Sequence, residues 1–159
     1  MTPQEVEFER TYEAPVGKVW QAWTMPEEIK KWWGPDNVTI PECEINLRVG
    51  GRIYIVMEAD KSMGEYAGTR WPMDGKFTEV ETNSKLSYEV KAWTEGDEEG
   101  TALEQVQQLS FSEENGKTKM HLKVTLKKIG PKAGMAVEGM QYGFSQQFDK
   151  LKKFLDSKE

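Results

Sequence analysis

Between residues 40 and 127 the chain is a succession of short segments in which apolar and polar residues alternate, each ended by a turn signal. The clearest turns are the acidic stretch at residues 95–100 and the Glu-Glu-Asn-Gly stretch at residues 113–116. Alternation with a period of two predicts strands, and short turns join neighbouring strands in antiparallel order. We therefore predict a meander of consecutive strands, four of which lie near residues 66–80, 85–93, 102–113 and 117–127.

One strand and two short helices are predicted before this meander. Residues 5–13 alternate in the manner of a strand. The second helix begins at Pro26, whose fixed φ suits a helix start, and it ends at Gly34-Pro35. The first helix carries an apolar stripe at i, i+3, i+4 and i+7, formed by Val16, Val19, Trp20 and Trp23.

The C-terminal part of the chain reads as one long amphipathic helix that follows a loop at residues 128–134. Its apolar residues recur at intervals of three or four, and an apolar stripe of this kind must be covered by another element. A sheet covered by this helix gives an α+β fold. With no internal repeat or linker, we predict a single domain over residues 1–159. The stripe consists of Met140, Phe144, Phe148, Leu151 and Leu155.

The hairpin at Gly50-Gly51 has two possible registers. A loop of these two glycines alone would bring apolar residues of one strand onto the face of charged residues of the other. A three-residue loop that also includes Val49 avoids this, with Gly51 in the left-handed conformation that glycine adopts cheaply. We predict the second register, which places Cys43, Ile45 and Leu47 on the same face as Ile53, Ile55 and Met57.

Charge and hydropathy argue against two kinds of partner. The formal net charge of −6 would repel a phosphate backbone, so nucleic acid is not expected to bind. No apolar run is long enough to span a bilayer, and residues 1–5 have neither the basic flank nor the apolar stretch of a signal peptide. We expect a cytoplasmic location.

The single cysteine, Cys43, and the single histidine, His121, cannot together complete a tetrahedral zinc site. Cys43 lies in an alternating apolar run, so we interpret it as a core residue rather than a catalytic thiol. His121 alternates with Met120 and Leu122 and is predicted to face solvent, where it is a poor general base for chemistry inside the protein. No metal or other cofactor is expected.

Several short motifs, taken in order, resemble a known family. The order of elements resembles the helix-grip superfamily of START and Bet v 1-like (SRPBCC) proteins. Within it, the motifs look like the activator of Hsp90 ATPase homologue 1-like (AHSA1-like) family, with Phe in place of Trp in the last helix. The motifs are Ala14-Pro15, Val19-Trp20, Pro26-Glu27, the Lys-Trp-Trp-Gly-Pro run at 31–35, the Leu-Arg-Val-Gly-Gly-Arg run at 47–52, Gly143-Phe144 and Asp149-Lys150-Leu151.

This resemblance implies a curved antiparallel sheet closed over the C-terminal helix, with a hydrophobic cavity between them. We expect the cavity to bind a small hydrophobic or aromatic molecule without catalysis, and Arg10 is a possible polar anchor. For each aromatic candidate the alternative is an ordinary core residue. The candidate pocket residues are Trp32, Trp33, Tyr54, Trp71, Tyr88, Gln105, Gln107, Met120, Leu122, Met140, Phe144 and Phe148.

Two features of the sequence bear on the choice between a cavity and a filled core. Gln105 and Gln107 share the parity of apolar residues on one predicted strand, so both amides would point inward and need hydrogen-bond partners, unless that strand end has left the core. Gly139 and Gly143 lie four residues apart on the last helix. Glycine is unfavourable in a helix interior, which indicates either open space or close packing beside it.

Two other functions remain in competition with ligand binding. The family resemblance admits a co-chaperone-like role with a partner such as Hsp90, for which the outer face of the sheet and the 95–100 loop are the available surfaces. An enzyme resembling the cyclase and aromatase members of the superfamily is the third possibility. The acidic residues Glu42, Glu58 and Asp74 form no recognisable constellation of acids and bases with His121, so catalysis is less favoured.

Overall fold

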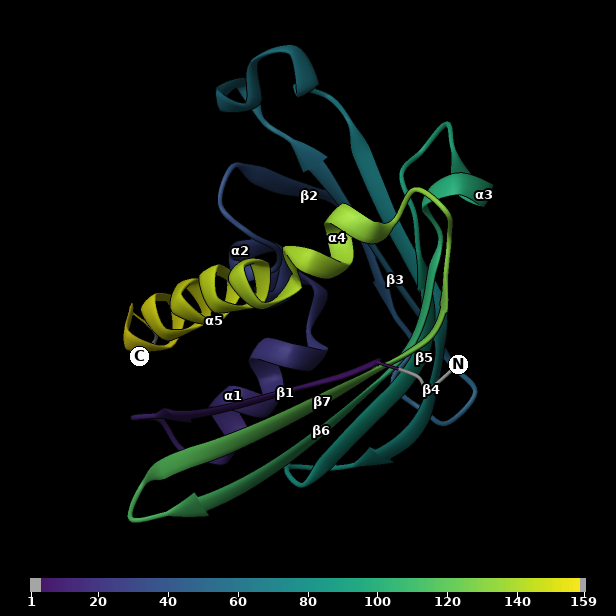
Figure 1. Ribbon diagram of the computed structural model, residues 1–159. Coiled ribbons are helices and arrows are strands. Elements are labelled where there is room, and N and C mark those ends of the chain that lie inside the picture. Colours follow the sequence, from purple (N-terminus) through teal and green to yellow (C-terminus); the bar gives the residue numbers. More distant parts are fainter. Residues whose placement is uncertain (1–3, 158–159) are drawn as a thin grey trace.

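The computed structural model describes residues 4–157, apart from the side chains of Gln4 and Met135. Residues 1–3, part of the stretch on which the cytoplasmic expectation rests, lie outside the described residues, as do residues 158–159 of the predicted single domain. In the described part, one curved antiparallel sheet wraps around a long helix (Figure 1). The predicted α+β helix-grip architecture is confirmed.

All seven strands in the described residues belong to one sheet, in the order β1-β7-β6-β5-β4-β3-β2. The meander from β2 to β7 pairs each strand with the next, and β1 closes the far edge by pairing with β7. The strands are β1 (Gln4–Tyr12), β2 (Val38–Ile45), β3 (Arg52–Ala59), β4 (Arg70–Glu81), β5 (Lys85–Ala92), β6 (Leu103–Glu114) and β7 (Lys117–Ile129).

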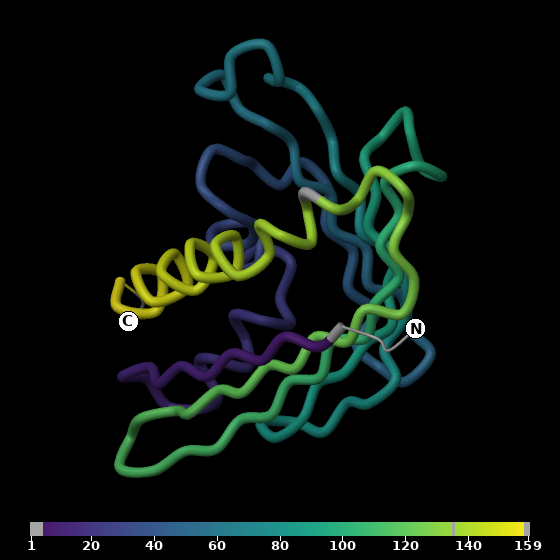
Figure 2. The backbone as a smooth tube through the Cα atoms, viewed as in Figure 1, coloured from purple at the N-terminus to yellow at the C-terminus, as the bar shows by residue number. Residues whose placement is uncertain are grey.

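The helices follow the predicted order, with three additions. The additions are a 3-10 segment after β3, one helical turn after β5 and a short helix before the last one. Figure 2 shows the chain leaving β7 and turning back over the sheet into the two C-terminal helices. The helical elements are α1 (Val16–Thr24), α2 (Pro26–Trp32), η1 (Lys61–Tyr66), α3 (Glu98–Thr101), α4 (Gly134–Glu138) and α5 (Met140–Ser157).

The core fills the space between the concave face of the sheet and three helices that cover it, namely α1, α2 and the C-terminal half of α5. On β7 the alternation is as predicted, because Met120 and Leu122 are fully buried whereas His121 is on the outer face. Trp23 of α1 packs edge-on against Trp32 of α2, with ring centroids 4.8 Å apart. These large rings fill one end of the space under the sheet.

The β2–β3 hairpin differs from the prediction. Ile45 pairs with Ile53 and Cys43 with Ile55, two residues away from the predicted register. These residues share a face as predicted, but Leu47 does not, because it is exposed in the loop of residues 46–51. The loop is wider because it also bonds to β4: the Gly50 amide donates to the Phe77 carbonyl, and the Phe77 amide donates to the Gly51 carbonyl. Gly50, and not Gly51, has the left-handed conformation, with φ of 83°.

Gly51 is required because its backbone lies close to that of Asn46, and a substitution tests this. A Cβ at Gly51 would lie 2.0 Å from the Asn46 carbonyl oxygen, which is backbone and cannot swing aside. Gly51→Ala is expected to lower the free energy of unfolding by about 1–3 kcal/mol. Gly17→Ala is the control, since a Cβ there meets nothing within 4 Å. Urea denaturation of both variants checks this, and equal midpoints would contradict the loop geometry.

Candidate functional site

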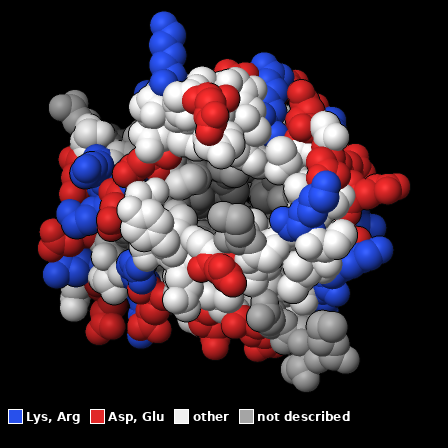
Figure 3. Space-filling view, turned by 45° about the horizontal axis from the view of Figure 1, so that its top comes forward, with Lys and Arg blue, Asp and Glu red and all other residues white. Residues whose placement is uncertain are grey.

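A cavity of about 420 Å³ lies between the sheet and the two C-terminal helices. Figure 3 looks into a hollow whose rim is mostly uncharged, with Lys, Arg, Asp and Glu gathered around the outside. Its described residues come from the α2–β2 turn, from the five strands β2 to β6, from η1, from α4 and α5, and from Gly139 between these two helices. Six of the candidate residues line it: Trp33, Trp71, Gln105, Gln107, Met140 and Phe144.

Five other candidates lie in the core beside the cavity instead. Tyr88, Met120 and Leu122 are on the inward face of the sheet, and Trp32 and Phe148 face the core from α2 and α5. All five belong to the hydrophobic core, and none is among the residues that line the cavity. All five are at most 1% exposed. These residues are Trp32, Tyr88, Met120, Leu122 and Phe148.

Tyr54 and Arg10 also lie away from the cavity. Tyr54 has the opposite parity to Ile53 and Ile55 on β3, so it is on the outer face, where the Arg52 guanidinium lies 4.2 Å from its ring centroid. Arg10 donates to the Ser145 hydroxyl at 3.4 Å and lies over the Phe148 ring. Arg10, the possible polar anchor, therefore contacts α5 and is not among the residues that line the cavity.

Several lining residues were missed in the sequence. Met57 and Met73 share the inward parity of their strands, so the alternation could have revealed them. Gln147 lies three residues after Phe144, on the same face of α5, and helical spacing could also have revealed it. Met63 comes from η1, for which the sequence offered no pattern.

The inward amides on β6 form a directional chain of hydrogen bonds. The Tyr88 hydroxyl donates to Gln107 Oε1 at 2.6 Å, and Gln107 Nε2 donates to Gln105 Oε1 at 2.9 Å. Burial raises the pKa of Tyr88 far above its usual value, so the phenol stays protonated and donates. Since the two glutamines are only 6% and 3% exposed, the strand has not left the core.

Gln147 joins α5 to the turn after α2. Its Oε1 accepts the Gly34 amide at 2.9 Å, while its Nε2 is buried with no hydrogen-bond partner among the described residues. Lys150, one turn further on, donates to the carbonyls of Trp33, Gly34 and Pro35 at 3.4, 3.2 and 3.1 Å. Burial lowers the pKa of Lys150. These bonds fix the position of Trp33 beside the cavity.

Two glycines near the start of α5 lie at the cavity. Gly139 and Gly143 both line it, in the break between α4 and α5 and in the first turn of α5. A Cβ added at Gly143 would meet nothing within 4 Å. Of the two explanations considered for these glycines, open space applies to Gly143.

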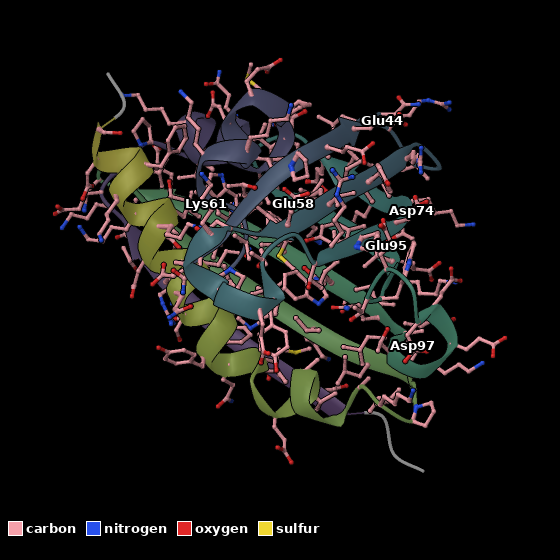
Figure 4. All side chains as sticks on the ribbon, turned by 90° about the horizontal axis from the view of Figure 1, so that it is seen from above. Glu44, Glu58, Lys61, Asp74, Glu95 and Asp97 are labelled. Atoms are coloured by element: carbon pink, nitrogen blue, oxygen red, sulfur yellow. The ribbon has the colours of Figure 1, made fainter. Side chains whose placement is uncertain are left out.

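The acidic residues Glu58 and Asp74 are on the outer face of the sheet. Figure 4 shows Asp74, Glu95 and Asp97 on the side away from α5. Asp74 accepts two hydrogen bonds from Arg52, at 3.0 and 2.8 Å, and Glu58 accepts one from Arg70 at 2.8 Å. Within residues 4–157, no group of three His, Cys, Asp or Glu side chains could hold a metal ion.

Cys43 behaves as a partly buried thiol, and its reactivity is testable. Burial raises the pKa of Cys43 to about 11. Because the thiolate is the reacting species, the folded protein should react with DTNB at pH 8 about a hundredfold more slowly than the chain unfolded in urea. Equal rates in the two states would show that the thiol is accessible and ordinary.

The fold and the cavity together define a class: a helix-grip protein with a hollow beneath its C-terminal helix. The chain belongs to the family described as "Activator of Hsp90 ATPase homolog 1-like protein", which matches residues 13–156. Comparison with curated protein sequences finds no match. Within the described residues, no helix is long and apolar enough to cross a membrane.

Solved structures share the fold over nearly the whole chain. Protein NE0264 from Nitrosomonas europaea superposes with a TM-score of 0.76 at 23% identity, covering 96% of this chain and 94% of its own. Protein CV1439 from Chromobacterium violaceum gives 0.78 at 17% identity, with 98% and 100% covered. The AHSA1 (SPO3351) protein from Silicibacter pomeroyi gives 0.71 at 19% identity, with 96% and 98% covered. At these identities the similarity concerns the fold alone.

Proposed function

We propose that this protein binds a small, mainly apolar or aromatic molecule in the cavity beneath α5, without chemical conversion. The observation that carries the proposal is the cavity itself, because about 420 Å³ lies within the range of roughly 300–1,000 Å³ typical of ligand pockets. Its surroundings suit an apolar ligand, with Trp33, Trp71, Phe144 and four methionines around it.

The side chains at the cavity favour binding over catalysis. Among its described lining residues, Asp36 has the one ionisable side chain, and it is exposed. General acid–base catalysis needs a positioned donor and acceptor of protons within reach of the bound molecule. His121 is on the outer face, where its Nε2 lies 3.0 Å from Glu7.

Apolar contact alone would give modest affinity. Burying about 300 Å² of apolar ligand surface at about 25 cal/mol per Å² stabilises a complex by roughly 7 kcal/mol. Association costs at least about 4 kcal/mol in lost freedom of motion. A tight and selective complex therefore requires polar contacts in addition to the aromatic and methionine side chains.

Native mass spectrometry of protein purified gently from its own source tests the proposal. We expect a stoichiometric small molecule that leaves on denaturation. Gly143→Phe, which fills the cavity, is the control, and this variant should be purified without the small molecule. An unliganded mass for the wild-type protein, together with no binding of neutral aromatic probes, would contradict the proposal.

A protein partner is the second candidate, favoured by the family's description and by the outer face of the sheet. There, Tyr54 and Trp93 are half-exposed, and the cation Lys91 lies 5.2 Å from the Trp93 ring. Aromatic and charged residues gathered in this way are common in interfaces. If the wild-type protein stimulates the ATPase activity of Hsp90 and Tyr54→Ala does not, a co-chaperone role is supported. If the wild-type protein gives no stimulation, this role is contradicted.

A further inference from the structure

Two glutamine amides lie on opposite sides of the cavity, one on the sheet and one on the helix. Gln105 of β6 and Gln147 of α5 both line it, and they are 6% and 5% exposed. An amide group has one acceptor oxygen and two N–H donors. In each of these residues the structure uses the oxygen, so the remaining hydrogen-bonding capacity is that of a donor.

Gln105 is the end of the hydrogen-bond chain on the sheet. Its Oε1 accepts from Gln107 Nε2, and Gln107 Oε1 accepts from the Tyr88 hydroxyl. The chain runs in one direction, from the Tyr88 hydroxyl through Gln107 to Gln105. Gln105 Nε2 is left at the cavity as the terminal donor.

Gln147 on α5 resembles Gln105 in that its amide oxygen is already used as an acceptor. Its Oε1 is occupied by the Gly34 amide, and its Nε2 is among the buried side-chain nitrogens without a partner in the described chain. Leaving a buried donor unpaired costs about 1–3 kcal/mol, and buried polar groups nearly always have partners. A ligand oxygen beside Nε2 would remove this cost.

The charges near the cavity favour an uncharged acceptor. Lys150, the nearest described cation on α5, is directed at three backbone carbonyls of residues 33–35 and not at the cavity. The carboxylate of Asp36 lies on the cavity rim. The described lining residues include this one carboxylate and no cation, so a ligand anion would gain no direct ion pair in the cavity.

From these observations we propose that the ligand is a neutral, mainly apolar molecule with a carbonyl-type oxygen, to which Gln105 Nε2 and Gln147 Nε2 donate hydrogen bonds. The inference rests on the proposed function, since it concerns the same cavity. It adds the chemical class of the ligand: ketones, esters, lactones or quinones, in preference to hydrocarbons and carboxylates.

Three matched probes test this class: 2-acetylnaphthalene, 2-ethylnaphthalene and 2-naphthoate. The ketone is better hydrated than the hydrocarbon, so a cavity without donors would prefer 2-ethylnaphthalene. We expect the reverse in isothermal titration, with the ketone bound about tenfold more tightly than the hydrocarbon because it pairs the buried donors. The carboxylate should bind more weakly than the ketone.

Methionine substitutions at the two anchors separate the donors from the shape of the cavity. Gln105→Met and Gln147→Met keep a long unbranched side chain and remove the amide. Gln105→Met should lower the affinity for the ketone about tenfold and leave that for 2-ethylnaphthalene within about twofold. Gln147→Met also removes the acceptor of the Gly34 amide, so its effect is measured as the ratio of the two affinities, which should fall about tenfold. Gln108→Met is the control, because Gln108 is on the exposed face of the same strand.

The outcomes distinguish this inference from the proposed function. If all three probes bind and the hydrocarbon binds most tightly, the cavity is a binding site but the amides do not select the ligand, and the inference is overturned. If none binds, the proposed function fails and the inference with it. Should the methionine variants not fold, the order of the probes in the wild-type protein decides alone.

Discussion

Gly143→Phe is expected to lower the affinity for any cavity ligand at least about a hundredfold. The new ring would grow from the first turn of α5 into space that is open, since a Cβ at this position meets nothing within 4 Å. It would lie beside Phe144 and Met140 and occupy volume that the ligand needs. Titration with 2-acetylnaphthalene measures the loss, and circular dichroism verifies that the fold is retained.

Gly143→Ala is the matched control for this substitution. A single methyl group occupies little of a 420 Å³ cavity, so binding should stay within a few-fold of the wild-type protein. The same change removes a glycine from a helix and should raise the free energy of unfolding by about 0.5–1 kcal/mol. If the phenylalanine variant bound the ligand as tightly as the alanine variant, the cavity would not be the binding site.

Trp32→Ala is expected to lower the free energy of unfolding by about 3–5 kcal/mol. Trp32 is fully buried at the end of α2, and its ring centroid is 4.8 Å from that of Trp23 and 5.4 Å from that of Trp33. Its indole N–H donates to the Ala22 carbonyl at 2.9 Å. The truncation would leave a void and an unpaired carbonyl at once. Urea denaturation measures the effect.

Two further variants calibrate this result. Trp32→Phe keeps most of the packing and removes the indole donor, so it should cost less than the alanine variant. Trp93→Ala removes a half-exposed ring from the outer face and should cost about 1 kcal/mol or less. A loss in Trp32→Ala no larger than that in Trp93→Ala would mean that the tryptophan cluster does not support the fold.

The strand order and the inward faces could be predicted because alternation and turn residues are local properties. Met120 and Leu122 illustrate the limit of that reasoning. Parity shows which face of the strand a side chain is on, but it does not show whether that part of the face lines the cavity or the filled core. Both are buried under the part of the sheet that is filled. Tyr54 could have been assigned correctly from its parity with Ile53, because a strand places adjacent side chains on opposite faces.

The end of α2 decides which tryptophan meets the cavity, and sequence reasoning could not resolve it. Trp32 is the last residue of the helix and points into the core, whereas Trp33 is extended, with φ of −66° and ψ of 143°. That conformation depends on contacts from far along the chain, since Gln147 and Lys150 hold the turn at Gly34. Helical spacing within α2 carries no information about these partners.

Methionine-methyl NMR with and without 2-acetylnaphthalene tests the central claim most directly. Four methionines, Met57, Met63, Met73 and Met140, line the cavity, whereas Met120 is buried elsewhere in the core and Met25 is exposed. The ring current of a bound naphthalene should shift the methyl signals of the cavity set and leave those of Met120 and Met25 in place. Unchanged signals from the cavity set at saturating probe, or shifts confined to Met25, would contradict a ligand site beneath α5.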